Sequence, residues 1–272
     1  MKMIVIVITG ASDGIGAEMA RQLAKRHGSQ VALVLAARNQ TRLEQVADQC
    51  AAFGAHTQIA PCDVSVEPEC RALVANAAAR FGGIDVLINN AGISAQALLD
   101  EVKADDMKWY EQLMRVNFWG SVWCTHAALP YLKQSRGCIV AVSSLAGLFG
   151  VPGRTAYSAS KFAMTGFFEA LRAELKTAGV SVTTAYPGVV ATQIRHHGLN
   201  AAGQTAGSSG LKEDNAMSVE ECAGLILQGM DRREREVVMT AKGKLGRWLK
   251  LLAPARVEAM ALAALKDEVK PP

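Results

Sequence analysis

Short hydrophobic runs alternate along the chain with longer segments whose apolar residues recur at helical spacing. Most of the runs are continuously apolar, which is typical of strands covered on both faces of a parallel sheet. The predicted strands are Met3–Thr9, Val31–Ala37, Thr57–Pro61, Ile84–Asn89, Cys138–Ser143, Val180–Tyr186 and Glu236–Thr240. The predicted helices are Gly14–His27, Gln40–Phe53, Val66–Phe81, Trp109–Gln134, Thr155–Thr177 and Val219–Arg232.

This strand–helix alternation predicts an α/β fold. Strands joined through helices form right-handed crossovers, so we expect a single Rossmann-type, doubly wound parallel sheet of about seven strands with helices on both faces. No change in composition marks a boundary within residues 1–240, and we expect one domain there. Residues 241–272 form a predicted amphipathic helical extension.

The extension carries leucines and a tryptophan interspersed with lysines and arginines over Lys242–Lys266, and Pro254 should divide it into two helices. Such a segment covers the mouth of a site, contacts a second subunit, lies on a membrane surface or packs on the core. The Gly-, Ser- and Ala-rich stretch Gly198–Asn215 is expected to be the least ordered and to act as a lid. Ser218 and Glu221 predict a capping box for the helix that follows it.

Composition excludes several classes of protein. The net charge of +4 is small and spread along the chain, which argues against nucleic-acid binding. The six cysteines include no C-x-x-C pair, so we expect reduced thiols in a cytoplasmic protein and no metal site. The apolar run after Lys2 is too short for a signal peptide, and no stretch is long and apolar enough to predict a transmembrane helix.

A glycine-rich loop, TGASDGIG, connects the first predicted strand to the first helix. Gly10 permits a tight turn, Gly14 lets a pyrophosphate approach the backbone, and Gly16 lets the helix pack on the strand. The free N–H groups at the start of the helix suit phosphates. The loop therefore predicts a dinucleotide site, formed by Gly10, Ser12, Asp13, Gly14, Ile15 and Gly16.

The end of the second strand indicates which dinucleotide binds. An acidic residue there favours NAD, because it bonds the ribose hydroxyls and repels a 2′-phosphate. Here the position after Ala37 is Arg38, whose guanidinium suits a phosphate. We therefore expect NADP(H), although the carboxylate of Asp13 could lie near the same phosphate.

Tyr157 and Lys161 lie four residues apart at the start of a predicted helix and share one face. A tyrosine has an ordinary pKa near ~10, and a nearby ammonium lowers it. The pair suits proton exchange with a hydroxyl or carbonyl.

Together these motifs resemble the short-chain dehydrogenase/reductase family over residues 1 to about 240. The order and intervals match as well as the residues. The matching elements are the glycine loop, Asp63-Val64, Asn89-Asn90-Ala91-Gly92, Asn117, Ser143-Ser144, Tyr157-x-x-x-Lys161, and Pro187-Gly188 with Thr192.

The resemblance implies a catalytic role for four residues. Tyr157 would be the acid in carbonyl reduction and the base in alcohol oxidation, with its pKa lowered by Lys161, which would also hold the nicotinamide ribose. Ser144 would bond the substrate oxygen, and Asn117 would hold a water in a proton relay to Lys161. Ser143, one residue earlier on the strand, should point elsewhere.

The resemblance also implies further cofactor contacts. Asp63 would meet the adenine, Val64 would pack on it, and Thr192 would bond the nicotinamide carboxamide. The remaining residues expected along the cofactor are Asn90, Ala91, Gly92, Pro187, Gly188 and Val190.

The segments expected around the nicotinamide, Ile93–Leu98, Leu145–Pro152 and Val189–Ile194, are apolar and suit a lipophilic ketone or secondary alcohol. The sequence around Ser144 and Tyr157 is similar to the hydroxysteroid dehydrogenase branch. The alternatives are a binding module that senses NADP(H) without turnover and a ketoacyl-carrier reductase. Family resemblance implies a homodimer or homotetramer, formed through the helices that contain Asn117 and Tyr157.

Overall fold

The computed structural model describes residues 3–207 and 216–268. Its centre is a parallel sheet of seven strands in the order β3-β2-β1-β4-β5-β6-β7, which confirms the predicted fold. The reversal of strand order between β1 and β4 creates a crevice at their carboxyl ends, where this fold binds ligands. The strands are β1 (Ile4–Thr9), β2 (Val31–Ala37), β3 (His56–Pro61), β4 (Val86–Asn89), β5 (Cys138–Val142), β6 (Ser181–Tyr186) and β7 (Glu236–Val238).

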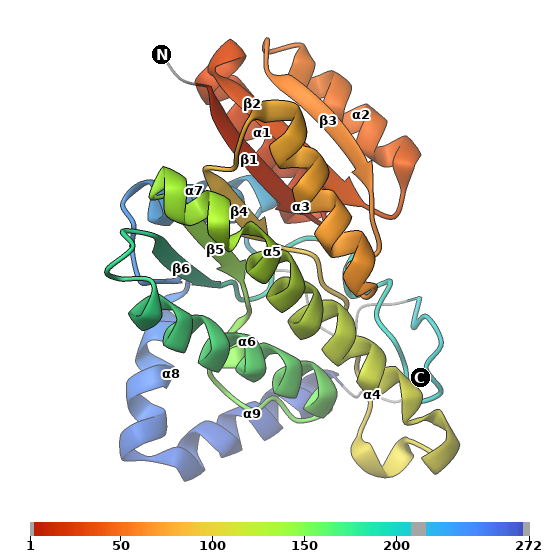
Figure 1. Cartoon of the computed structure of the whole chain (residues 1–272). Coiled ribbons are helices and arrows are strands. Elements are labelled where there is room, and N and C mark those ends of the chain that lie inside the picture. The colour runs from red at the N-terminus through yellow and green to blue at the C-terminus, as the bar shows by residue number, and fades with distance from the viewer. Residues whose placement is uncertain (1–2, 208–215, 269–272) are drawn as a thin grey trace.

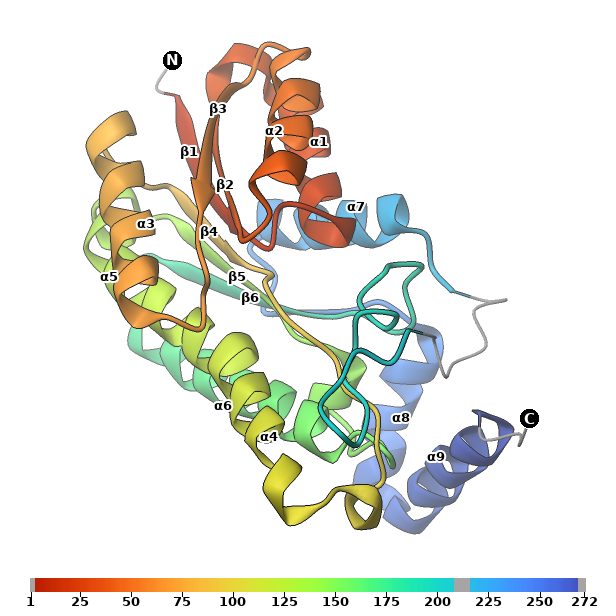
Figure 2. The same ribbon diagram turned by 90° about the vertical axis from the view of Figure 1, so that its right-hand side faces the viewer.

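Helices cover both faces of the sheet (Figures 1 and 2). One layer contains α1 (Gly14–His27), α2 (Gln40–Ala51) and α7 (Val219–Asp231), and the other contains α3 (Glu67–Phe81), α5 (Gly120–Ser135) and α6 (Thr155–Glu174). The short helix α4 (Lys108–Leu113) precedes α5. Single 3-10 turns occur at Gly28–Gln30, Leu99–Glu101, Ala104–Asp106 and Leu145–Gly147.

Successive strand residues point to opposite faces and divide the core into two hydrophobic clusters. On β1, Ile6 and Ile8 pack with α1, α2 and α7, whereas Val7 packs with α3, α5 and α6. All three residues are at most 1% exposed. Each continuous apolar run that predicted a strand therefore supplies buried side chains to both faces of the sheet.

The segment predicted as one helix, Trp109–Gln134, is instead interrupted by a π-helical turn. The residues Met114–Trp119 form this wider turn between α4 and α5. A π turn adds one residue to the helical repeat, which a simple periodicity analysis does not detect. The turn contains Asn117, one of the predicted catalytic residues.

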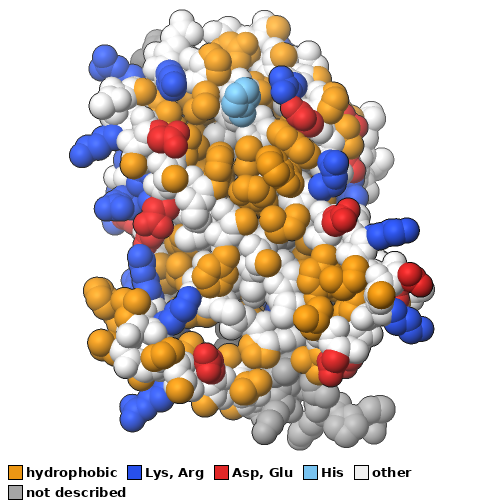
Figure 3. All heavy atoms as spheres, turned by 60° about the horizontal axis from the view of Figure 1, so that its bottom comes forward, with side chains coloured by type: hydrophobic (Ala, Val, Ile, Leu, Met, Phe, Trp, Pro, Cys, Tyr) orange, Lys and Arg blue, Asp and Glu red, His pale blue; other side chains and the backbone are white. Residues whose placement is uncertain are grey.

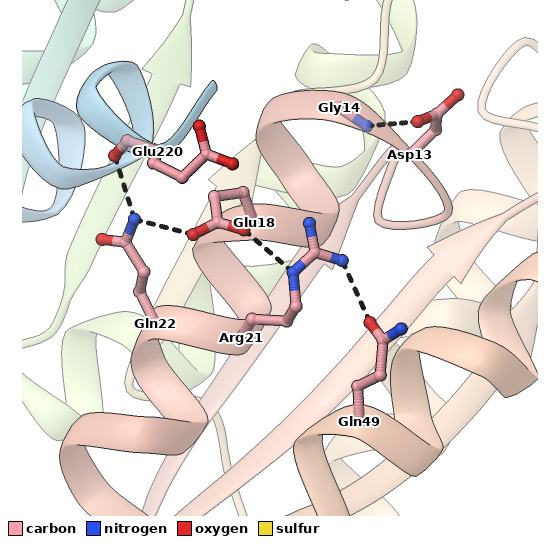
Figure 4. A network of polar contacts seen from close by, with 7 residues as sticks. All are labelled: Asp13, Gly14, Glu18, Arg21, Gln22, Gln49 and Glu220. Carbon is pink, nitrogen blue, oxygen red and sulfur yellow. Dashed lines mark hydrogen bonds and ion pairs between the residues drawn. The ribbon is translucent and has the colours of Figure 1, made fainter. Parts of the chain in front are cut away.

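Helix α1 is held in place by a polar network around the buried carboxylate of Glu18 (Figure 4). Arg21 donates to this carboxylate at 2.8 Å and to Gln49 of α2 at 3.1 Å. Gln22 donates to it at 2.9 Å and to the Glu220 carbonyl of α7 at 3.0 Å. These bonds fix α1 between α2 and α7, and so fix the position of its N-terminus.

The C-terminal extension forms α8 (Ala241–Leu252) and α9 (Pro254–Glu268), divided at Pro254 as predicted. Ser218 caps α7 by accepting from the Glu221 N–H at 3.0 Å, which is the serine half of the predicted capping box. Of the stretch expected to be least ordered, 198–207 forms turns and short β-bridges around Leu199, and 208–215 lies outside the described residues. Within the described part of the chain, no helix is long and apolar enough to cross a membrane.

Candidate active site

A groove with a volume of about 840 Å³ lies at the carboxyl ends of the central strands. It runs from the glycine loop after β1 to the C-terminal helices, which lie beyond the loops after β6 (Figure 2). Of the residues predicted for the site, all except Gly16 and Asn117 line this groove. The fold thus brings together segments that are far apart in the sequence.

The glycine loop packs directly against the turn after β4. Gly10 has a φ of 66°, and a Cβ atom there would lie 2.8 Å from the Ala91 Cα. The Thr9 hydroxyl accepts from the backbone N–H groups of Asn90 and Ala91 at 3.0 and 3.1 Å. At Gly16, a Cβ atom would collide with the Gly10 carbonyl and the Asn90 amide. Gly16 therefore permits the close packing of α1, which is why it does not face the groove.

The residues predicted for the adenosine end surround one end of the groove. Asp13 caps α1 by accepting from the Gly14 N–H at 2.7 Å, and it pairs with Arg42 at 3.1 Å. Arg38 is exposed and lines the groove beside Arg42. Asp63 accepts from the Ser65 N–H and hydroxyl at 2.9 and 2.7 Å, which shapes the turn after β3.

The adjacent serines at the end of β5 point in different directions. The Ser143 hydroxyl donates to the Lys161 carbonyl at 3.2 Å, which fastens β5 to α6. The Ser144 hydroxyl accepts from the Ala146 N–H at 3.2 Å. Ser144 also lies close enough to Tyr157 to lower the pKa of the phenol, against the larger effect of burial. The structure thus pairs Ser144, rather than Ser143, with the tyrosine.

Lys161 is buried at 3% exposure. Its Nζ donates to the Val142 carbonyl at 3.0 Å, contacts the Met164 sulfur at 3.6 Å, and lies 5.8 Å from the centre of the Tyr157 ring. Burial disfavours the ammonium form and lowers the pKa of Lys161 to about 8.

Burial raises the pKa of Tyr157 above its ordinary value. The Ser144 hydroxyl and the charges of Arg154 and Arg195 lower it, but they do not offset the burial. The expectation that the phenol is more acidic than an ordinary tyrosine is therefore wrong. It failed because it considered the neighbouring ammonium and left out the desolvation of the phenolate.

Asn117 is fully buried within the π turn and does not line the groove. Its side-chain oxygen accepts from the Ile93 N–H at 2.8 Å, and its nitrogen donates to the Ile93 carbonyl at 3.0 Å and the Ser160 hydroxyl at 2.9 Å. Asn117 therefore joins the segment after Gly92 to α6. That it holds a relay water stays a prediction.

The segment after β6 closes the groove on the other side of the glycine loop. A Cβ atom on Gly14 would lie 3.3 Å from the Thr192 methyl group, so this threonine lies against the loop. Gly188 lies beneath Leu145 and Thr240, where a Cβ would lie 3.4 and 3.2 Å from their side chains. Val190 is held by a β-bridge to Met217.

The prediction for the substrate end was right only in part. From Leu145–Pro152 and Val189–Ile194 most residues line the groove, but from Ile93–Leu98 only Ile93 and Ser94 do. Ala95 and Ala97 pack instead into a hydrophobic cluster with Trp109 and Leu113. The apolar pattern alone does not distinguish a groove wall from a core.

Several groove residues were not predicted, because they come from segments without a motif. At the adenosine end these are Asn39, Arg42 and Cys62. At the other end they include Arg154, Arg195 and His197. Seven residues from α8 and α9 also line the groove, which agrees with one of the roles considered for the extension, that of covering the mouth of a site: Lys242, Gly243, Gly246, Leu249, Val257, Met260 and Ala261. Among the described residues no cluster of His, Cys, Asp or Glu could hold a metal ion.

Comparison with known proteins identifies the family. A family model described as short chain dehydrogenase matches residues 4–202. The 11-beta-hydroxysteroid dehydrogenase A of Sesamum indicum is 36% identical over 260 residues, covering 93% of this chain and 73% of that protein. The dehydrogenase/reductase SDR family protein 7-like of Dictyostelium discoideum is 32% identical over 271 residues, covering 98% and 83%.

A similar solved structure is an alcohol dehydrogenase from the archaeon Thermococcus sibiricus, complexed with 5-hydroxy-NADP. It superposes with a TM-score of 0.73 at 25% identity, covering 87% of this chain and 94% of that one. The chain belongs to the short-chain dehydrogenase/reductase family of oxidoreductases, in a branch with the 11-beta-hydroxysteroid dehydrogenase-like proteins.

Proposed function

We propose that this chain is an NADP(H)-dependent oxidoreductase that interconverts a lipophilic ketone and the corresponding secondary alcohol. The observation that carries the proposal is the convergence of Ser144, Tyr157 and Lys161 on the groove that the glycine loop opens. A dinucleotide fits this loop, because Gly10, Ser12, Gly14 and Ile15 line the groove at the N-terminus of α1, where a helix favours phosphates.

When bound, the nicotinamide supplies or accepts the hydride. Tyr157 donates a proton to the carbonyl oxygen during reduction and removes it during oxidation. Ser144 donates a hydrogen bond to the same oxygen and stabilises its developing charge. Lys161, whose Nζ donates to the Val142 carbonyl, would hold the ribose of the cofactor.

The raised pKa of Tyr157 favours the role of acid. A phenol that keeps its proton at neutral pH is ready to donate it to a carbonyl oxygen. Alcohol oxidation needs the phenolate and should accelerate as the pH rises.

Two arginines support NADP over NAD. Arg38 follows β2 where an acidic residue would select NAD, and Arg42 of α2 lines the same groove. The pair between Arg42 and Asp13 also offsets the carboxylate that would otherwise repel a 2′-phosphate.

The C-terminal helices support a lid for the substrate end. Lys250 of α8 donates to the Leu148 carbonyl at 2.9 Å and lies 4.8 Å from the centre of the Phe162 ring. These contacts hold α8 over the wall formed by Leu145 and Phe149. The groove lining from both helices favours this role over plain core packing.

The outer surface of the extension suits a partner. Large apolar side chains of α8 and α9 that do not line the groove are exposed: Leu245, Trp248, Leu251, Leu252 and Leu262. Figure 3 shows hydrophobic patches with lysines and arginines around them on the side that carries the lower helices of Figure 1. We propose a homo-oligomer, in which Trp119 and Phe162, both exposed on the helices near Asn117 and Tyr157, supply further contacts.

Removal of residues 242–272 separates the roles of the extension. Loss of turnover with unchanged oligomer size supports a lid, whereas a smaller oligomer supports a subunit contact. Loss of binding to anionic liposomes would support peripheral membrane contact.

The six free and buried thiols support a cytoplasmic location.

The proposed function is tested by following the absorbance of reduced nicotinamide with a panel of ketones that includes steroids and ketoacyl thioesters. We expect NADPH oxidation with lipophilic ketones and a decrease in turnover of about 1,000-fold in Tyr157→Phe, with NADPH affinity retained. Tyr131→Phe on α5 is the matched control. NADPH binding without turnover would instead support a sensing module, and turnover of thioesters alone a ketoacyl-carrier reductase.

A further inference from the structure

A buried serine, Ser160, occupies one of the unspecified positions between Tyr157 and Lys161 on α6. Tyr157 and Lys161 both line the groove, whereas Ser160 does not and is 0% exposed. Its side chain is therefore out of reach of a substrate or a cofactor in the groove. Any effect of Ser160 on the reaction must pass through the residues that it contacts.

The Ser160 hydroxyl joins two segments of the chain. It donates to the Tyr157 carbonyl at 2.8 Å and accepts from the Asn117 side-chain nitrogen at 2.9 Å. A bond to a carbonyl one turn back is common for a serine within a helix, but the bond from another element is not part of that local pattern. The hydroxyl therefore connects the π turn to the backbone of the residue that carries the phenol.

The Asn117 amide needs Ser160 to pair both of its N–H groups. One N–H donates to the Ile93 carbonyl and the other to Ser160, while the amide oxygen accepts from the Ile93 N–H. Without the serine oxygen, a fully buried N–H would lack this partner, which is unfavourable. A Cβ atom on Gly92 would lie 3.2 Å from the Asn117 oxygen and 3.6 Å from the Lys161 Nζ. Ser160 thus holds an amide that lies close to Lys161.

The other contacts between these segments are less directional or more exposed. The Tyr157 ring packs against a hydrophobic cluster formed by Ala95, Ala97, Trp109, Leu113 and Ala156. Apolar packing of this kind is non-directional, whereas a hydrogen bond constrains both distance and angle. The Tyr110 and Thr155 hydroxyls also join α4 to α6 at 2.7 Å, but at an exposed position where water can replace either partner. The buried bond to Ser160 therefore constrains the first turn of α6 more strongly.

From these contacts we propose that Ser160 is a positioning residue for Tyr157. By holding the Asn117 amide and the Tyr157 carbonyl together, its hydroxyl fixes the distance of the phenol from the reacting oxygen. A misplacement of about 1 Å can reduce the rate of a reaction about 100-fold. This inference rests on the proposed function for the reaction itself, and it adds a residue that affects turnover without touching the substrate.

A kinetic experiment separates positioning from binding. With a ketone that the wild-type chain reduces, Ser160→Ala should lower kcat by about 10- to 100-fold and leave KM and the NADPH dissociation constant unchanged. Ser121→Ala is the matched control, because this buried hydroxyl donates to the Asn117 carbonyl at 3.2 Å from α5. It should retain the wild-type kcat. An equal fall in kcat in both variants, or an increase in KM alone in Ser160→Ala, overturns the inference.

Fluorine NMR on the full chain tests the same role without turnover or cofactor. The chain has four tyrosines, and after labelling with 3-fluorotyrosine the Tyr157 resonance is identified by its loss in Tyr157→Phe. We expect one narrow Tyr157 resonance in the wild-type chain and in Ser121→Ala, and a broadened or divided one in Ser160→Ala. An unchanged resonance in Ser160→Ala overturns the inference. A broadened resonance in a chain that reduces no ketone would uphold the positioning of Tyr157 and contradict the proposed function.

Discussion

The two ends of the groove are built in different ways. The adenosine end consists mainly of short turns that directly follow β1, β2, β3 and β4, so neighbouring strands of one sheet position most of its residues. The substrate end gathers the turn after β5, the segment after β6 and helices α8 and α9. The first end is a property of the sheet, whereas the second depends on how several separate segments pack together.

This difference indicates which changes act on the cofactor and which act on substrate choice. Substitutions in the glycine loop should affect every carbonyl substrate equally, because each one needs the same cofactor. Substitutions in α8 should change the order of preference among substrates and leave the cofactor affinity alone. The four predictions below test this separation, from the largest expected effect to the smallest.

Gly16→Ala should damage the adenosine end most severely. The added methyl group would collide with the Gly10 carbonyl and the Asn90 amide, and overpacking of this kind costs about 3 kcal/mol. We expect a lower free energy of unfolding and weaker NADPH binding, measured by chemical denaturation and fluorescence titration. Gly224→Ala on α7, where the new atom makes only an ordinary contact at 3.6 Å, is the control. Equal effects of the two changes would disprove the packing argument.

Lys161 should make the stability of the free chain depend on pH. Its pKa falls from 10.5 to about 8 on folding, so between these values the unfolded chain holds more protons. The free energy of unfolding should therefore rise with pH across that range, by about 3 kcal/mol from this group. Lys161→Met should lack this rise, whereas Lys176→Met, at an exposed position, should retain it. Parallel pH profiles for wild type and Lys161→Met in denaturant titrations would contradict the prediction.

Arg38→Asp should shift cofactor preference toward NAD. A charge-assisted contact to the 2′-phosphate contributes about 1.5–3 kcal/mol, so the ratio of NADP to NAD affinity should fall by up to about 100-fold. The two dissociation constants are measured in the same titration series. Preference among ketones should not change, since Arg38 lies at the adenosine end. An unchanged ratio would show that Arg38 does not contact the phosphate.

Leu249→Ala should act on substrate choice alone. Loss of a half-buried leucine side chain from the groove wall should weaken binding of a large ketone by about 1 kcal/mol, which raises its KM roughly 5-fold. A small ketone should be affected less, and NADPH affinity not at all. Leu251→Ala, which is 73% exposed and does not line the groove, serves as the control. A matching change in NADPH affinity would mean that the two ends are coupled.

The fold was predictable because each strand is a local feature of the sequence. The strand Val31–Ala37 and the helix Gly14–His27 have the predicted bounds, because a continuous apolar run and a glycine loop define them without help from tertiary contacts. The π turn at Asn117 was not predictable, since its widened repeat is set by bonds to Ile93 and Ser160 from other segments.

The candidate site divides in the same manner. The positions of Ser144, Tyr157 and Lys161 followed from spacing, because a strand end and one helix turn determine them. The pKa of Tyr157 did not follow from spacing, because the burial of its phenol depends on all the segments that form the groove. Arg154 and Arg195 carry no sequence signal that separates them from surface arginines, and only the packed structure shows that they line the substrate end.

The groove wall supplied by α8 and α9 has a consequence for how this chain can diversify. The glycine loop directly follows β1, whereas α8 and α9 come after all seven strands of the sheet. Evolutionary changes confined to residues 241–268 are therefore expected to alter the substrate range while they leave the proposed hydride chemistry intact.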